Sequence, residues 1–150
     1  MANTDVATLQ KLRDLTGAGV MECKKVLEEV KGDMEKAAAL IRERGLVKLE
    51  KRADRETGAG VVTSYVHGGR IGVLVDLRAE TDFVVRSEPF QQLAHELVLQ
   101  LSAVPAANVE EFLATPYIRD DKRTVQDLVK DVIARVGENV RVNAIARLEI

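Results

Sequence analysis

Residues 80–90 read Glu-Thr-Asp-Phe-Val-Val-Arg-Ser-Glu-Pro-Phe, and the hydrophobic period of the chain changes within this stretch. The alternating apolar run at 71–79 predicts a strand, and the apolar residues that follow at helical spacing predict a helix. Residues 81–86 fit neither period, so we expect a loop held between two well-specified elements, a common place for functional groups. Phe83 is either a buried residue that closes the sheet against the helix or an exposed contact residue.

The residues around this stretch predict a small α+β domain. Val61–Val66 and residues 71–79 flank His67-Gly68-Gly69-Arg70, which is a hairpin signal. Ser87 is expected to cap a helix that ends at Pro105, with its apolar stripe at Phe90, Leu93, Ala94, Leu97, Val98 and Leu101. A hydrophobic face of this width is buried when it packs on a sheet.

The rest of this domain follows the same logic. Asn108 caps a short helix that ends before Pro116, and a longer helix runs from Thr124 to Gly137. A last strand is predicted with one face made of Val140, Val142, Ala144, Ala146, Leu148 and Ile150. We therefore predict a small antiparallel sheet of about three strands, covered by helices on one face.

Residues 4 to 45 predict three short helices. Thr4 or Asp5 caps the first, Gly17-Ala18-Gly19 ends it, Gly32-Asp33 separates the second from the third, and Gly45 ends the third. A core this small encloses no substrate pocket, which favours a docking module. The charge run at 48–56 predicts a helical linker. The expected domains are 1–52, a three-helix bundle, and 53–150, an α+β core, with the boundary near 52–58.

Composition favours an ordinary globular protein. The chain has 150 residues, 46% of them hydrophobic and 31% charged, and its net charge of -2 gives no support for direct nucleic-acid binding. The first five residues lack a secretory signal, and no apolar run is long enough to span a membrane. The single cysteine, Cys23, fits a reducing cytoplasm.

No arrangement of residues points to catalysis. The sequence has no nucleophile elbow and no phosphate-binding glycine loop, and its carboxylates show no metal-ligand spacing. Cys23 lies on an apolar helix face, where a core residue is the usual case. We expect no enzyme, no cofactor and no metal, but a binding protein that presents a fixed loop. A weaker alternative is a hydrolase that pairs His67 or His95 with Asp82.

Two stretches resemble the bacterial translation elongation factor Ts family. Leu12-Arg13-Asp14-Leu15-Thr16-Gly17-Ala18-Gly19-Val20-Met21-Glu22-Cys23-Lys24-Lys25-Val26-Leu27 is similar to its N-terminal signature, and Glu80-Thr81-Asp82-Phe83-Val84 is similar to its central one. Gly137-Glu138-Asn139-Val140 and the strand after it resemble the family's C-terminal end. The resemblance implies a bundle similar to a ubiquitin-associated (UBA) domain and a guanine-nucleotide exchange factor. Its partner is then elongation factor Tu, both GDP-bound and nucleotide-free.

The resemblance also implies roles for particular residues. The loop Thr81, Asp82, Phe83 and Val84 then inserts near the partner's magnesium site, which weakens GDP binding. The bundle docks through Leu12, Arg13, Thr16, Gly17, Ala18, Gly19, Val20 and Met21. An adaptor that binds a partner without causing exchange remains the alternative.

The chain departs from the family pattern in two ways. Arg78-Ala79 stands before the loop where the family usually has Asn-Cys. The chain also lacks the longer members' duplicated core half and helical insertion, so the resemblance implies a homodimer through the outward face of the sheet.

Overall fold

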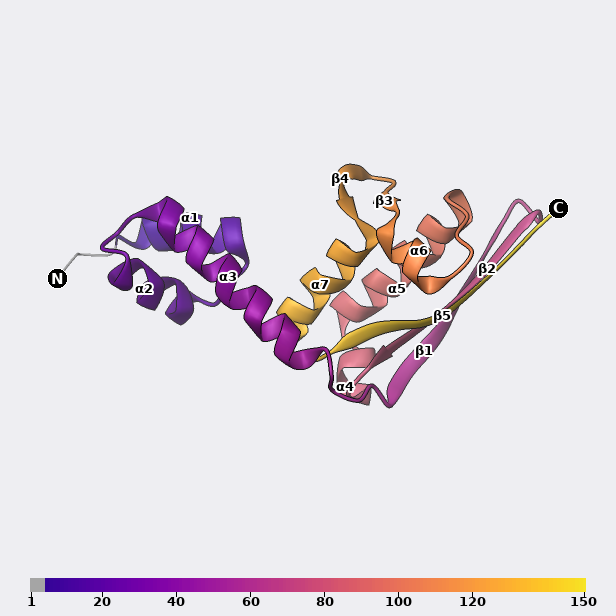
Figure 1. Ribbon diagram of the computed structural model, residues 1–150, viewed down its shortest axis with the longest axis horizontal. Helices are drawn as coiled ribbons and strands as arrows, with labels where there is room; N and C mark the ends of the chain where they lie inside the picture. Colours follow the sequence, from indigo (N-terminus) through magenta and orange to yellow (C-terminus); the bar gives the residue numbers. More distant parts are fainter. Residues whose placement is uncertain (1–4) are drawn as a thin grey trace. The chain divides into compact units, whose positions relative to one another are not determined.

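The structure is a computed structural model that describes residues 5–150. The chain divides into two compact units, one that ends at Lys51 and one that spans Arg52–Ile150. The ribbon in Figure 1 shows helices alone in the first unit, and a sheet with helices in the second. Together the two units have the elements of the predicted α+β class.

Three helices form the first unit: α1 (Val6–Thr16), α2 (Val20–Glu29) and α3 (Met34–Arg52). Asp5 caps α1 by accepting a hydrogen bond from the Ala7 amide, whereas Thr4 lies outside the described residues. Gly17 ends α1 with a φ of 69°, a left-handed conformation that favours glycine. The small core consists of Leu12, Cys23, Val26, Leu27, Ala37 and Ile41.

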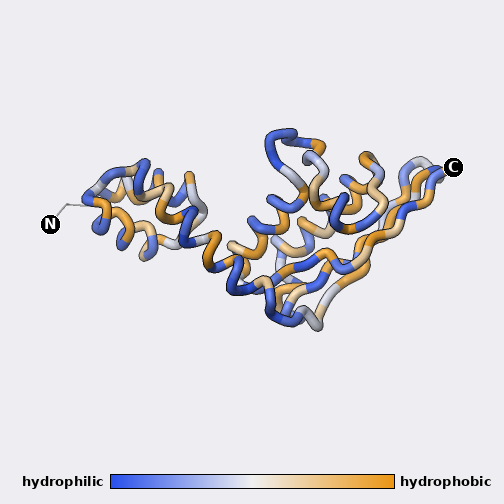
Figure 2. The backbone as a smooth tube through the Cα atoms, viewed as in Figure 1, coloured by the Kyte–Doolittle hydropathy of each residue, from blue (hydrophilic) through white to orange (hydrophobic). Residues whose placement is uncertain are grey.

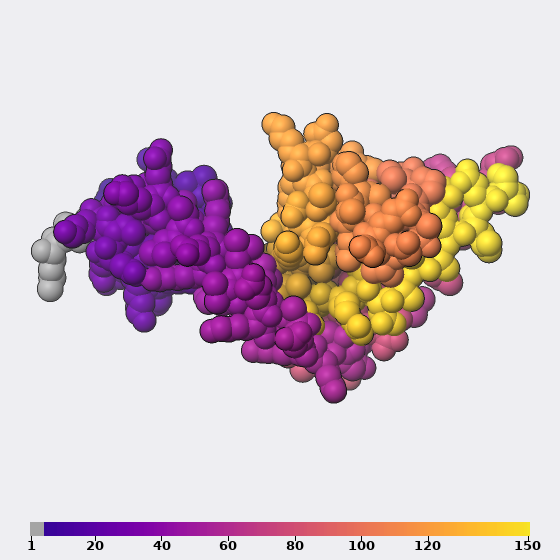
Figure 3. All heavy atoms as spheres, in the orientation of Figure 1, coloured from indigo at the N-terminus to yellow at the C-terminus, as the bar shows by residue number. Residues whose placement is uncertain are grey.

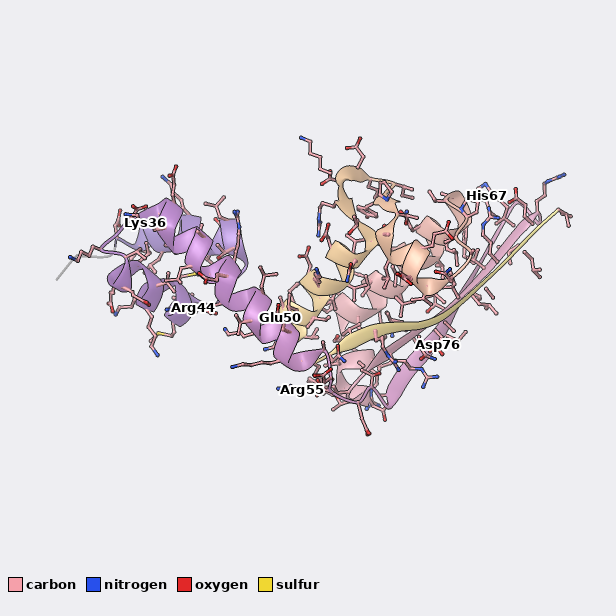
Figure 4. The ribbon with its side chains drawn as sticks, in the orientation of Figure 1. Lys36, Arg44, Glu50, Arg55, His67 and Asp76 are labelled. Atoms are coloured by element: carbon pink, nitrogen blue, oxygen red, sulfur yellow. The ribbon has the colours of Figure 1, made fainter. Side chains whose placement is uncertain are left out.

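The predicted end of the third helix at Gly45 is wrong. Helix α3 continues through Gly45 to Arg52, so the start of the charge run is helical, as the linker prediction requires. A glycine inside a helix costs only about 1 kcal/mol. Ion pairs join α3 to α2 on both sides of Gly45: Arg44 pairs with Glu29 at 2.7 Å and Lys48 with Glu22 at 2.8 Å. Figure 4 labels Arg44 on this helix.

The second unit is built on an antiparallel sheet of three strands in the order β1-β2-β5, which are β1 (Ala59–His67), β2 (Ile71–Ala79) and β5 (Val140–Glu149). Helices α4 (Asp82–Val85), α5 (Glu88–Ala103), α6 (Val109–Ala114) and α7 (Val125–Val136) cover one face of this sheet. The hairpin and both long helices are therefore where the sequence predicted them.

The core of this unit lies between the sheet and α5. Its large, fully buried apolar side chains are Val75, Leu77, Phe90, Leu97, Val98, Leu101, Phe112 and Val125. Figure 2 shows hydrophobic and hydrophilic residues alternating along the tube in the helices and strands, as expected for elements that bury one face. Each of these buried side chains contributes about 1.5–3 kcal/mol of transfer free energy before the entropy cost of ordering it.

The prediction that one alternation runs through the whole last strand is wrong. Leu77 pairs with Val142, but the next pair is Asp76 with Ala144, so Asn143 forms a bulge. One extra residue reverses the faces of everything beyond it. Val140 and Val142 are buried, whereas Ala144, Ala146 and Leu148 are exposed on the opposite face. Arg147 instead faces α5 and donates to the Leu101 carbonyl at 2.9 Å.

A second small sheet was not predicted. Strands β3 (Pro116–Tyr117) and β4 (Asp120–Thr124) pair with each other, although β4 is polar. Gln100, which is fully buried in α5, fixes this hairpin: its amide donates to the Pro116 carbonyl and accepts from the Ile118 amide, both at 2.9 Å. The space-filling view in Figure 3 shows β5 along the surface of the second unit, as an edge strand of its sheet.

Candidate partner-binding site

Residues 82–85 form a helix, which corrects the prediction of an irregular loop at 81–86. Helix α4 is a single turn that begins after Thr81, whose hydroxyl oxygen accepts from the Val84 amide at 3.4 Å. The turn continues through hydrogen bonds from the amides of Val85 and Arg86 to the carbonyls of Thr81 and Asp82. Four residues are too few to show a helical period, so the pattern could not predict this turn.

Phe83 points into solvent from this turn. Its side chain is 82% exposed, and Asp82 beside it is exposed as well, whereas Val84 and Val85 are buried. Helix α4 packs against β1, β2 and α5, so the two valines anchor it to the core. The alternative that Phe83 closes the core is wrong. An isolated exposed aromatic on an anchored turn is suited to fill a pocket on a partner.

Hydrogen bonds hold the C-terminal end of α4. Ser87 donates its hydroxyl to the Val84 carbonyl, and Gln91 donates its amide to the Val85 carbonyl, both at 2.6 Å. Ser87 also precedes α5, as predicted, but it makes no capping hydrogen bond to that helix. The orphan carbonyls of a short helix are thus satisfied by side chains.

The predicted docking residues of the first unit surround the corner between α1 and α2. Gly17, Gly19, Val20 and Met21 are exposed there, with Met21 at 68%. Arg13 is exposed as well, and Thr16 and Ala18 are half-buried. Leu12 differs from all of these, because it is fully buried in the core and makes no surface. Leu15, which was not assigned to the site, adds a 64% exposed apolar side chain to this corner.

Arg78, the departure from the family pattern, does not brace α4. Its guanidinium donates to both carboxylate oxygens of Asp76, at 2.6 and 3.0 Å, and Asp76 also accepts from Asn143 at 2.9 Å. These bonds, first of all that from Arg78, hold the pKa of Asp76 below its usual range. Gly60 leaves room for Arg78, since a Cβ there would lie 2.4 Å from the Arg78 Cδ. Figure 4 labels Asp76 on the face away from the helices.

The histidines give no acid–base pair with Asp82. His67 shares a hydrogen bond of 3.0 Å with Tyr65. It is the last residue of β1 and pairs with Ile71 at the start of β2, whereas Asp82 follows the other end of β2 (Figure 4). Nine strand residues span about 30 Å. His95 is exposed on α5. Within residues 5–150, no three His, Cys, Asp or Glu side chains cluster in a way that could hold a metal ion. No helix of this range has the length and hydropathy to cross a membrane.

Sequence reasoning missed the residues that hold α4 in place. The hydrophobic pattern predicts no role for Gln91 or Glu138, and it predicts only a helix cap for Ser87. All three act through side-chain hydrogen bonds: Ser87 and Gln91 bond to nearby carbonyls, and Glu138 bonds to Thr81, which is distant in the sequence. Hydrophobic periodicity does not reveal such bonds. The polar run Gly137-Glu138-Asn139 directly before a strand is the one signal in the sequence that could have indicated side-chain hydrogen bonds there.

The fold and these two surfaces define a class: a binding protein that presents apolar side chains from a helical unit and from an α+β unit. Comparison with known proteins identifies the family. The family described as Elongation factor TS matches residues 80–150. Proteins named Elongation factor Ts are similar over nearly the whole chain: that of Thermotoga maritima is 37% identical, covering 95% of this chain and 94% of its own length.

Two further relatives with the same name agree. The protein of Coprothermobacter proteolyticus is 36% identical over 93% of this chain and 94% of its own length. That of Finegoldia magna is 34% identical over 100% of this chain and 91% of its own length. The chain belongs to the elongation factor Ts family, and its role is that of an elongation factor Ts in translation. The Finegoldia alignment runs over 203 positions against 150 residues here, so that relative carries segments this chain lacks.

Proposed function

We propose that this protein is a guanine-nucleotide exchange factor that binds elongation factor Tu·GDP in the cytoplasm and promotes the release of GDP. Membership in the family supports the activity. The observation that carries the mechanism is the exposure of Phe83 on a turn anchored by Val84 and Val85. The proposal assigns the partner-binding segment to Thr81, Asp82, Phe83 and Val84, in which the exposed Asp82 and Phe83 meet the partner and the buried Val84 holds the turn in place.

The mechanism needs no covalent chemistry from this chain. In a nucleotide-binding protein, magnesium bridges the phosphates to the protein, so a side chain that displaces its ligands weakens GDP binding. Phe83 acts as a compact wedge with few rotatable bonds, and Asp82 accepts hydrogen bonds from the partner. Coupling is reciprocal, so GDP weakens binding of the factor by the same ratio, and GTP in excess displaces the factor from the nucleotide-free complex.

The corner between α1 and α2 is proposed as the docking surface. Its exposed apolar residues are Leu15, Val20 and Met21, and Arg13 is exposed on the same helix as Leu15; methionine and arginine are enriched in protein interfaces. Leu12 supports this surface from below. Docking by a UBA-like unit and insertion by α4 then divide the work between affinity and exchange.

A homodimer is proposed through the open face of the sheet. Val62, Val66, Leu74 and Leu148 are exposed there, although β-branched and aliphatic side chains on a sheet face are usually covered. Arg78 and Asp76 satisfy each other, so burying this face against a second copy leaves no unpaired charge from that pair. Sedimentation across a concentration series tests this, and Leu74→Lys is expected to give monomers.

Release of a fluorescent GDP from elongation factor Tu, followed by stopped flow after mixing with this protein and excess unlabelled GTP, tests the exchange activity. We expect the release rate to rise with protein concentration to a plateau. A complex that forms while the release rate stays at its spontaneous value would contradict the proposal and leave an adaptor without exchange activity.

A further inference from the structure

We infer that Glu138 is a positioning residue for exchange: it joins the segment before β5 to Thr81, the residue that caps α4, and so fixes where Phe83 stands. The inference rests on the proposed exchange function. The hydrophobic pattern predicts no role for Glu138, which is 57 positions from Thr81 in the sequence. The contacts that carry it belong to one hydrogen-bonded cluster between residues 80–81 and residues 138–139.

Glu138 binds Thr81 with both carboxylate oxygens. Its Oε1 accepts from the Thr81 amide at 3.0 Å, and its Oε2 accepts from the Thr81 hydroxyl at 2.8 Å. The same hydroxyl accepts from the Val84 amide at 3.4 Å. A carboxylate at this point satisfies the backbone before the turn and orients the capping hydroxyl, and hydrogen bonds to a charged acceptor are stronger than neutral ones.

The neighbouring residues make a second link in the opposite direction. Glu80 Oε1 accepts from the Asn139 amide at 2.7 Å, so each segment supplies one carboxylate to the other's backbone. Asn139 is only 6% exposed, and its side-chain amide donates to the carbonyls of Ala53 and Arg55 at 3.3 and 2.9 Å. Arg55, labelled in Figure 4, pairs with Glu80 at 3.5 Å. Glu138 is thereby held by its own buried neighbour.

The position of Glu138 explains why an isolated turn can be stiff. A four-residue helix has too few internal bonds to be stable alone. Ser87 and Gln91 secure its last carbonyls, the two valines secure its underside, and Glu138 secures its start. Without Glu138 the start of the turn frays and Phe83 samples several positions. The conformation that can insert into the partner is then less populated, which lowers the rate of exchange.

The first test uses the free protein and needs no partner. Glu138→Ala is expected to speed hydrogen exchange at the amides of Val84, Val85 and Arg86 about tenfold, while Glu110→Ala, which removes the same charge from α6, leaves them unchanged. Glu138→Gln is expected to stay within about threefold of the original protein, because an amide can accept from the Thr81 amide and donate to its hydroxyl. Unchanged exchange in Glu138→Ala would overturn the inference.

The second test separates positioning from docking. In stopped-flow GDP release, Glu138→Ala is expected to lower the plateau rate about tenfold and to change the half-saturating concentration less than twofold. The double variant Glu138→Ala with Phe83→Ala is expected to be no slower than Phe83→Ala alone, since both changes remove one wedge. If Glu138→Ala slows the Phe83→Ala protein as much as it slows the original, Glu138 acts by another route and the inference fails.

The two tests distinguish this inference from the proposed function. Should the original protein release no GDP, the exchange function fails, while the hydrogen-exchange result still decides whether Glu138 holds α4. Glu138→Asp serves as the variant that keeps the charge but shortens the reach, and it is expected to behave like Glu138→Ala. A fully active Glu138→Asp would indicate that charge and not geometry matters, which contradicts the positioning role.

Discussion

The two apolar surfaces of this protein are supported very differently. Phe83 stands on a turn that is anchored to a sheet-and-helix core and held by side chains at both ends. Val20 and Met21 are the first two residues of α2, directly after Gly19, and they lie on a unit whose core cluster has six buried residues. A side chain that inserts into a partner's pocket must be held in one position, whereas a docking surface only needs apolar area that a partner can bury. The difference in support therefore corresponds to the proposed difference in role.

The largest expected effect tests the weaker support. Leu12→Ala removes a fully buried side chain from the small first core and should cost about 3 kcal/mol in the unfolding free energy of that unit. Denaturant unfolding followed by hydrogen exchange in α1 measures it. Leu15→Ala, an exposed neighbour, is expected to cost less than about 0.5 kcal/mol. Equal effects from the two would mean that the bundle core does not hold this surface.

The second prediction concerns the wedge itself. Phe83→Ala should lower the plateau rate of GDP release by about 30-fold, in the range of an interface hot spot, without changing the unfolding free energy by more than about 0.5 kcal/mol. The exposed Phe83 side chain contributes nothing to the core, which is why stability is spared. Ile118→Ala, at the β3–β4 turn, is the matched loss of an exposed apolar side chain and should leave the rate unchanged.

Asp82→Ala belongs with Phe83→Ala, with a smaller effect on the same quantity. We expect the plateau rate to fall about fivefold, because one accepted hydrogen bond is lost from the inserted turn. A fall in docking affinity with an unchanged plateau rate would mean that Asp82 contributes to docking. That result would contradict the separation between a docking surface and an inserted turn.

The third prediction concerns the docking corner. Met21→Ala should raise the half-saturating concentration about fivefold and leave the plateau rate as it was, because affinity is lost and the wedge is not. Titration of the release rate against protein concentration separates the two quantities. Val6→Ala, exposed at the start of α1, is the control on the same unit. A lower plateau in Met21→Ala would break the division of roles.

The smallest effect depends on pH. Thr124 and Asp127 form a reciprocal capping box on α7, and the hydrogen bond from the Thr124 amide holds the pKa of Asp127 below its usual range. A carboxyl with a depressed folded pKa adds stability above its unfolded pKa of about 4, and that stability is lost as the pH falls through the folded pKa. Asp127→Asn should therefore reduce the acid-dependent loss in thermal unfolding of the second unit. An unchanged pH profile would exclude this contribution.

The sequence by itself determined most of the regular structure. Glycines in the β1–β2 turn, the six-position apolar stripe on α5, and capping residues such as Asn108 and Thr124 are local signals, and the structure confirms them. The two signature stretches also indicate the family from the sequence alone, and comparison with known proteins confirms that family. Local signals suffice where the period of one element decides which side chains are buried.

Where local signals conflict with long-range contacts, only the tertiary structure decided the outcome. The bulge at Asn143 reverses the faces of β5, and Arg147 turns to the end of α5 instead of to solvent. Gly45 remains helical within α3, and ion pairs from Arg44 and Lys48 to α2 lie on both sides of it. Phe83 is exposed, and α4 exists as a helix, because two buried valines anchor the turn and Thr81 before it donates hydrogen bonds to the distant Glu138. Long-range contacts of this kind have no period, so a linear sequence does not display them.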